Sequence, residues 1–168
     1  MELELRDHQV DVINTLRENF KKGCECPTCG QRVQLYKRKI NSGMALFLIG
    51  LYRLDNRYDK ENPGELHRNF FSNKEVMREM NLSASSLDYS VMKHFGLIEP
   101  RAAEGGKKNS GYWRLTHKGL LFTRWKARTP KYVFLYNNKI QGLSEETTTI
   151  KESLGDKFDF QELMNNNQ

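Results

Sequence analysis

Hydrophobic residues at helical spacing predict two helices in the first third of the chain. Residues 6–22 form the first pattern, because apolar side chains recur there every three or four positions, and Gly23 marks its end. The second helix is predicted over residues 35–54, within which residues 44–52 are apolar on nearly every side. A helix with that pattern is buried all round, so it is the expected centre of the core.

Capping residues and short apolar patterns predict a pair of short helices over residues 72–95. Ser72 or Asn73 can cap the first, since a side-chain oxygen there accepts a hydrogen bond from a free backbone N–H at the start of the helix. Ser83 can cap the second, over residues 84–95. The expected result is two short helices joined by a tight turn.

Strand signals concentrate in the second half of the chain. Residues 112–115 alternate in the manner of a strand, and a short helix is predicted after them over residues 118–126. Residues 132–140 predict a β-hairpin, because Asn137 and Asn138 tolerate the positive φ that a tight hairpin turn demands.

The stretch from Ser72 to Trp125 resembles the winged helix-turn-helix domains of bacterial and phage regulators. In that superfamily a Gly-Leu-Ile sequence follows the second helix, a charged loop comes next, and a pattern of tyrosine, leucine, threonine, lysine and glycine marks the wing and the helix after it. The matching residues here are Gly96–Ile98 and Tyr112–Gly119.

This resemblance implies a mainly α (α+β) fold with a winged helix-turn-helix core over residues 35–129. An N-terminal helix and a cysteine knuckle, residues 1–34, would precede the core. A β-hairpin and an acidic segment with one or two short helices, residues 130–168, would follow it. The first helix is then a candidate homodimer surface, as in many regulators of this fold, and a dimer would bind a two-fold symmetric site.

The resemblance also implies double-stranded DNA as the partner, with a recognition helix in the major groove and a wing on the adjacent backbone. Carried over position by position, the DNA-contacting residues would be Ala84, Ser85, Ser86, Tyr89 and Lys93 on the helix, and Lys107, Lys108, Asn109 and Arg114 on the wing. The helix has no Arg, Asn or Gln to bind guanine or adenine bidentately. Binding is therefore expected to depend mainly on backbone charge.

Charge is distributed unevenly around a net value of +6. Between Arg101 and Lys131 only Glu104 opposes a series of basic residues, whereas the chain from Ser144 onward is mainly acidic. Clustered basic residues release counterions from phosphates and are typical of polyanion binders. The alternative is that they only solubilise the protein. The basic residues are Arg101, Lys107, Lys108, Arg114, Lys118, Arg124, Lys126, Arg128 and Lys131.

All three cysteines, Cys24, Cys26 and Cys29, lie within six positions. The sequence Cys26-Pro27-Thr28-Cys29-Gly30 resembles the knuckle of zinc ribbons and rubredoxins, in which two intervening residues let both sulfurs face one metal. A structural Zn²⁺ ion is therefore the expected cofactor. A reversible Cys-x-x-Cys redox pair and three idle thiols are the alternatives, although no thioredoxin-like strand and helix precede the motif.

A structural zinc site needs four ligands, and the cysteines supply three. His67 is the first candidate for the fourth, while His94 and His117 stay open. His8 is excluded within one chain, because about 15 helical residues at about 1.5 Å each separate it from the cysteines.

The sequence favours binding over catalysis. It has no phosphate-binding glycine loop, no His-Glu-x-x-His and no Gly-x-Ser-x-Gly motif. The expected function is DNA binding in transcription regulation. The alternatives are a phage-type adaptor or inhibitor that binds a protein through residues 132–136 and 145–162, and RNA binding through exposed aromatics. The charged N-terminus and the shortness of the apolar runs predict a cytoplasmic protein that does not enter membranes.

Overall fold

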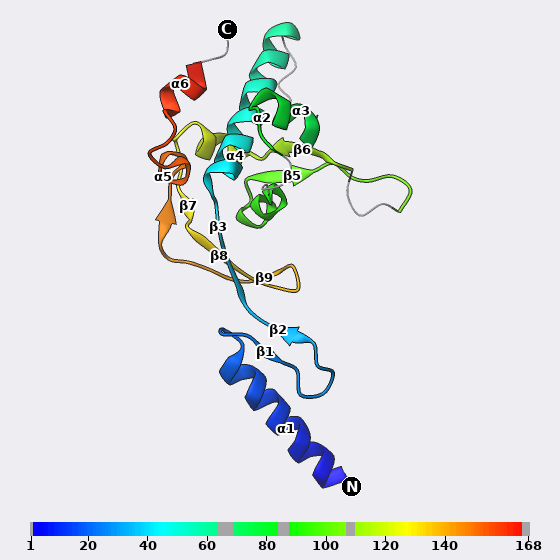
Figure 1. Ribbon diagram of the computed structural model, residues 1–168. Helices are drawn as coiled ribbons and strands as arrows, with labels where there is room; N and C mark the ends of the chain where they lie inside the picture. The colour runs from blue at the N-terminus through cyan, green and yellow to red at the C-terminus, as the bar shows by residue number, and fades with distance from the viewer. Residues whose placement is uncertain (1, 64–68, 84–87, 107–109, 166–168) are drawn as a thin grey trace. The chain divides into compact units, whose positions relative to one another are not determined.

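The computed structural model describes residues 2–63, 69–83, 88–106 and 110–165 (Figure 1). Helices and antiparallel strands occur together, so the predicted α+β class is confirmed at that level. The chain divides into two compact units. Unit 1 comprises Met1–Arg38 and Tyr132–Leu143, and unit 2 comprises Lys39–Lys131 and Ser144–Gln168. The boundaries differ from those expected at residues 34 and 129, because the hairpin predicted for the C-terminal appendage belongs to unit 1.

Unit 1 combines one helix, α1 (Glu2–Asn19), with two small sheets. Strands β1 (Cys24–Glu25) and β2 (Arg32–Val33) pair antiparallel. Strands β3 (Tyr36–Lys39), β8 (Tyr132–Tyr136) and β9 (Lys139–Leu143) form the second sheet in the order β3-β8-β9.

The β8–β9 hairpin of unit 1 confirms the prediction for residues 132–140. Asn137 and Asn138 form its turn with φ values of 46° and 59°, which lie in the left-handed region that these residues tolerate. Among the described residues of unit 1 the buried hydrophobic side chains are Val133 and Leu135. This unit therefore has a very small hydrophobic core.

Unit 2 is built around α2 (Ser42–Glu61), whose residues Met44–Leu51 are all buried (Figure 1). The predicted central helix is thus confirmed, but its expected start at Leu35 is wrong. Asn41 caps α2 by accepting a hydrogen bond from the Met44 N–H at 2.9 Å, and the residues before it form β3 instead. Strand β3 is defined by pairing with β8, almost a hundred residues later, which no local pattern reveals.

A three-stranded sheet and three short helices complete the core of unit 2. The sheet has the order β4-β6-β5, with β4 (Phe71–Ser72) and β5 (Ile98–Pro100) both antiparallel to β6 (Tyr112–Leu115). Helix α3 (Asn73–Glu79) and the 3₁₀ helix η2 (Tyr89–Phe95) lie between β4 and β5 in the chain, and α4 (His117–Thr123) follows β6.

Local sequence signals set the ends of these short helices. Ser72 and Glu75 form a capping box at the start of α3, so Ser72 is the cap of the two candidates, Ser72 and Asn73. Gly96 ends η2 with a φ of 72°, and Thr116 caps α4 by accepting from the Gly119 N–H at 2.9 Å. Of the second helix predicted over residues 84–95, the structure describes η2. Residues 84–87 lie outside the described part of the chain.

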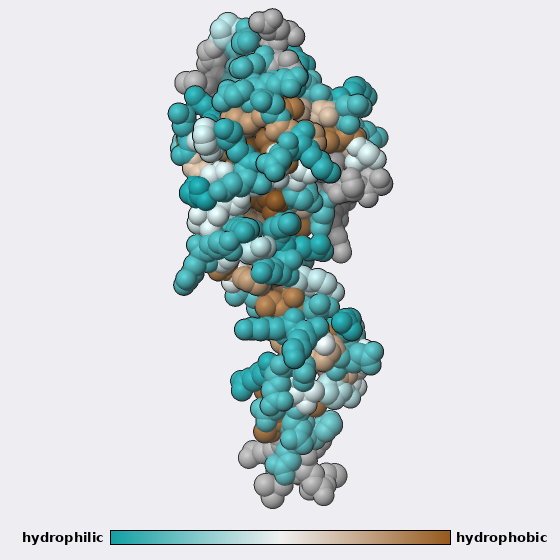
Figure 2. Space-filling view, turned by 60° about the vertical axis from the view of Figure 1, so that its left-hand side comes forward, coloured by the Kyte–Doolittle hydropathy of each residue, from teal (hydrophilic) through white to brown (hydrophobic). Residues whose placement is uncertain are grey.

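The last part of unit 2 contains the predicted short helices, α5 (Ile150–Leu154) and α6 (Phe160–Asn165). Before them, β7 (Thr129–Pro130) pairs antiparallel with β10 (Thr147–Thr148). On the face seen in Figure 2, hydrophilic side chains cover most of the surface, with hydrophobic ones visible in patches between them. None of the helices in the described ranges has both the length and the apolar composition needed to cross a bilayer.

Candidate nucleic-acid interface and cysteine knuckle

Tyr89, expected on the exposed helix face, is partly buried and packs against aromatic side chains of unit 2. Its ring stacks on Phe47 with the centroids 4.6 Å apart and meets Trp113 edge-on at 5.7 Å. Its hydroxyl oxygen accepts a hydrogen bond from Asn73 Nδ2 at 2.8 Å. The ring and the hydroxyl of Tyr89 thus both have partners within the fold, and its role as a DNA contact stays a prediction.

The type of helix explains why the Tyr89 side chain packs inward. A 3₁₀ helix has three residues per turn, so side chains three apart lie in line. Tyr89 therefore shares a face with Met92 and Phe95, which are both buried. Lys93 falls on another side and is exposed, as expected for a phosphate contact. The other expected contacts on this helix, Ala84, Ser85 and Ser86, lie outside the described residues.

The wing of the sequence prediction corresponds to the connection between β5 and β6. Lys107, Lys108 and Asn109 lie outside the described residues. Hydrogen bonds close the base of this connection: the Ser110 hydroxyl donates to the Arg101 carbonyl at 2.8 Å, and the Arg101 N–H donates to the Tyr112 carbonyl at 2.9 Å. Arg101 itself is exposed, with its guanidinium 5.8 Å from the centre of the Tyr112 ring.

Arg114 differs from the other expected wing contacts because it already has a carboxylate partner. Its Nε lies 2.6 Å from Glu99 Oε1 on the neighbouring strand, and its guanidinium lies 4.5 Å from the centre of the Phe70 ring. A phosphate at this position would have to compete with Glu99. Arg114 thus lies in a strand, as predicted for residues 112–115, but Glu99 compensates much of its charge.

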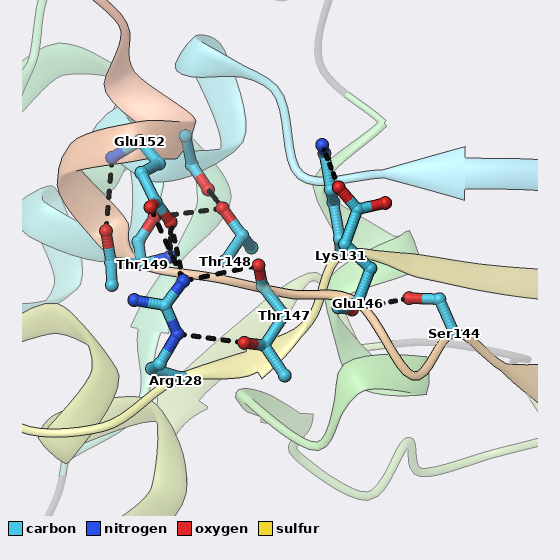
Figure 3. Close-up of polar contacts among 9 residues, drawn as sticks. Arg128, Lys131, Ser144, Glu146, Thr147, Thr148, Thr149 and Glu152 are labelled. Atoms are coloured by element: carbon cyan, nitrogen blue, oxygen red, sulfur yellow. Dashed lines mark hydrogen bonds and ion pairs between the residues drawn. The ribbon is translucent and has the colours of Figure 1, made fainter.

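The acidic C-terminal segment supplies further partners for basic residues (Figure 3). Arg128 donates to Thr147 Oγ1 at 2.8 Å and forms an ion pair with Glu152 at 3.2 Å. Lys131 forms an ion pair with Glu146 at 2.7 Å. Such exposed pairs add about 0–1 kcal/mol of stability. Their larger effect here is to neutralise two of the cations that the sequence offered for phosphate binding.

Glu152 has a second role at the start of α5. It accepts from the Thr149 N–H at 2.7 Å in a capping box. That backbone hydrogen bond and the nearby Arg128 charge lower the pKa of Glu152 below its ordinary value. The signal was present in the sequence as threonine followed three positions later by glutamate.

Apart from Lys118, four basic side chains in the described part of residues 88–131 are exposed and form no ion pair. They are Lys93, Arg101, Arg124 and Lys126. Lys118 is different, because its Nζ donates to the Phe95 carbonyl at 2.9 Å and burial lowers its pKa. The four exposed cations, together with the Lys107 and Lys108 charges of the sequence, constitute the candidate nucleic-acid interface.

The cysteine knuckle occupies the connection between β1 and β2. The Cys26 N–H donates to the Gln31 carbonyl, the Gly30 N–H donates to the Cys26 carbonyl, both at 2.8 Å, and Gly30 adopts a φ of 70°. The backbone N–H groups of Cys29 and Thr28, and then the Cys29 thiol, hydrogen-bond to the Cys26 sulfur and lower its thiol pKa. Cys26 and Cys29 are thus brought together in a form that favours the thiolate.

The expected four-ligand set of Cys24, Cys26, Cys29 and His67 is not assembled by the described part of the chain. Cys24 lies in β1 opposite Val33. In the described ranges there is no group of three or more His, Cys, Asp and Glu side chains placed to hold one metal ion. His67 lies outside these ranges. What the structure provides is a two-sulfur site.

A cavity beside the knuckle is lined by residues that are distant in the sequence. It has a volume of about 470 Å³ and is walled by both knuckle cysteines, by the end of α1 and by β8. Phe20 and Tyr136 meet edge-on there, with centroids 5.2 Å apart. No sequence signal links them, because the pairing of β3 with β8 alone brings them together. The lining residues are Leu16, Arg17, Phe20, Cys26, Cys29, Gln31, Val33 and Tyr136.

Comparison of the chain with protein-family models, curated proteins and solved structures gives no match.

Proposed function

We propose that this chain is a non-enzymatic DNA-binding protein, a transcriptional regulator whose unit 2 acts as a winged helix-turn-helix module. The order of elements in unit 2 supports this: α2, β4, α3, η2, β5, β6 and α4, with a small antiparallel sheet and a glycine-containing connection between β5 and β6. A wing of this kind contacts the DNA backbone next to the groove that the second helix enters.

The observation that carries the proposal is the sorting of the basic charges. Arg114, Arg128 and Lys131 have carboxylate partners, whereas Lys93, Arg101, Arg124 and Lys126 are exposed without one in the described ranges. Exposed cations without carboxylate partners are available to phosphates, and the sequence adds the charges of Lys107 and Lys108.

The proposed mode of binding is dominated by the phosphate backbone. Tyr89 is used in packing, and η2 has no Arg, Asn or Gln, so few of its side chains are suited to reading bases directly. Affinity should fall by roughly 0.9 log units per tenfold increase in salt for each phosphate contacted.

The test is a salt titration of binding to a random DNA duplex, followed by fluorescence anisotropy. The Lys107→Ala/Lys108→Ala variant should flatten the salt dependence by up to about 1.8 log units per tenfold salt. Arg128→Ala/Lys131→Ala is the matched control, because it removes the same charge from cations that already have carboxylate partners. Its salt dependence should stay close to that of the parent protein. Equal effects of the two variants, or no binding at low salt, would contradict the proposal.

A second candidate function, a protein-binding adaptor or inhibitor, is favoured by the surface of the β8–β9 hairpin. Ile140 and Leu143 on β9 are about half exposed, at 49% and 52%, and Tyr136 is exposed as well. Single exposed apolar residues are common, but three on one hairpin offer a contact surface. Ile140→Ser/Leu143→Ser should leave DNA binding unchanged if unit 2 carries the function, and should abolish partner binding if the hairpin does.

A further inference from the structure

The knuckle provides half of a zinc site. Zinc in structural sites takes four ligands in a tetrahedron, and two intervening residues allow both cysteine sulfurs to face one ion. Cys26 and Cys29 have this spacing, and both line the same cavity. In the described ranges no third His, Cys, Asp or Glu joins them to form a metal-binding group.

An apolar helix face lies next to this half-site. Leu16 and Phe20 of α1 line the cavity that Cys26 and Cys29 also line. One and two turns earlier, Ile13 and Val10 are 47% and 53% exposed although both are aliphatic. In Figure 2 hydrophobic residues are likewise visible at the surface in the lower part of the view, which contains α1.

We propose that two copies of this chain bind one Zn²⁺ ion between their knuckles, with Cys26 and Cys29 of each copy as the four ligands. On binding, each thiol releases its proton to solvent, so four protons leave for each zinc ion bound. The apolar face of α1 packs against the same face of the second copy. This inference concerns unit 1 and does not depend on the DNA-binding function proposed for unit 2.

Symmetry is the reason for choosing a second copy as the occupant. Most homodimers have a two-fold axis, and residues near that axis meet their own counterparts. A two-thiolate site on the axis is therefore completed to four thiolates by its own image, without a further ligand from elsewhere in the chain. The same axis gives Val10 and Ile13 an apolar partner, which is the usual solution for an exposed apolar helix face.

The small core of unit 1 supports the same conclusion. Val133 and Leu135 are its buried hydrophobic side chains within the described ranges. Units with so little buried apolar surface are usually stabilised by a metal, a disulfide or oligomerisation. A zinc ion shared by two copies provides both a metal and a dimer contact.

The test measures zinc content and molar mass on the reduced full-length chain. We expect one zinc ion per two chains and a mass twice the 19.7 kDa of one chain. Chelation should yield zinc-free monomer, and added zinc should restore the dimer. Cobalt in place of zinc should give the absorption of a tetrahedral four-thiolate site. One zinc ion per monomer, a dimer that survives chelation, or no zinc uptake after reduction would overturn the proposal.

Two sets of variants keep the test independent of folding failures. Cys26→Ser/Cys29→Ser should lose both zinc and dimer, whereas Cys24→Ser, the matched control in the same hairpin, should keep both. Val10→Glu/Ile13→Glu should raise the dimer dissociation constant at least tenfold, with one zinc ion per two chains still bound in whatever dimer forms. Loss of zinc in Cys24→Ser would show a site built within one chain and would overturn the proposal. Circular dichroism of each variant checks that the helices remain.

Discussion

Gly119 shows at the scale of one residue how closely the elements of unit 2 approach each other. It is the third residue of α4, and its N–H donates to the capping Thr116 side chain. A Cβ added at this position would overlap the carbonyl oxygen of Leu97. The overlap is with backbone, so no side-chain rotation can relieve it. The glycine is therefore required by the close packing of α4 against the residues before β5.

Gly119→Ala is predicted to destabilise unit 2 strongly. Overpacking of this kind costs about 1–3 kcal/mol, and a backbone clash belongs at the upper end of that range or above it. Urea unfolding, followed by circular dichroism, gives the free energy of unfolding. Gly142→Ala is the control, since a Cβ there meets nothing closer than 3.9 Å, and it should change the value by less than about 0.5 kcal/mol. Equal stability of the two variants would refute the packing argument.

Helix α3 illustrates what local chemistry contributes at the scale of an element. It has only seven residues, so its end groups matter more than its length. Glu75 Oε2 accepts from the Ser72 hydroxyl at 2.7 Å and from the Ser72 N–H at 2.8 Å. These two hydrogen bonds, with a smaller effect of Arg78, lower the pKa of Glu75 below its ordinary value of 4.5.

The lowered pKa of Glu75 predicts a pH-dependent contribution to stability. A depressed carboxyl pKa stabilises the fold fully above the unfolded-state value and loses this effect as the pH falls through the folded-state value. Glu75→Gln should therefore lower the free energy of unfolding at pH 7 by about 0.5–1 kcal/mol, and the deficit should shrink below pH 4.5. Urea unfolding between pH 7 and pH 3 measures it. Glu104→Gln, in an exposed loop, is the control, and a deficit that does not change with pH would contradict the prediction.

Elements with local signals could be predicted from the sequence, and those defined by distant partners could not. The cap at Ser72, the Asn137-Asn138 turn and the apolar run of α2 are encoded by neighbouring residues, and the structure confirms them. Strand β3 was predicted as helix because its partner β8 is distant in sequence.

The candidate interface was predictable to a similar extent. The sequence gives the positions of the basic residues, but the ion pairs of Arg114, Arg128 and Lys131 depend on tertiary contacts. Tyr89 was assigned from the resemblance, and its contacts with Phe47 and Trp113 depend on tertiary packing that the resemblance does not give. The joining of Cys26 and Cys29 was predictable from their spacing, whereas the cavity that they share with Tyr136 was not.

At the scale of the whole molecule, the two units differ in how they are stabilised. Unit 2 holds nearly all of the buried hydrophobic side chains in the described ranges, while unit 1 has two and the knuckle. Unit 2 should therefore keep its structure when unit 1 loses its own. If zinc binds the knuckle, its removal should destabilise unit 1 and leave unit 2 folded.

This difference predicts the outcome of hydrogen exchange with and without a chelator. If zinc holds the knuckle, chelation should speed exchange of the Cys26 and Gly30 amides, which form the knuckle's backbone hydrogen bonds. The amides of Met44–Leu51 in α2 should exchange at unchanged rates, because their burial does not depend on metal. Mass spectrometry of peptides from both regions measures this. A uniform increase across both regions would show that the units do not unfold separately.

The assembly of unit 1 from two distant segments has a consequence for synthesis on the ribosome. Strand β3 emerges roughly 90 residues before β8, which at about 5–20 residues per second leaves it without its partner for about 5–20 s. An unpaired strand edge is a template for pairing with another chain. Lys37, Arg38 and Lys39 give this strand three consecutive positive charges. Nascent copies would repel each other at that edge until β8 arrives to cover it.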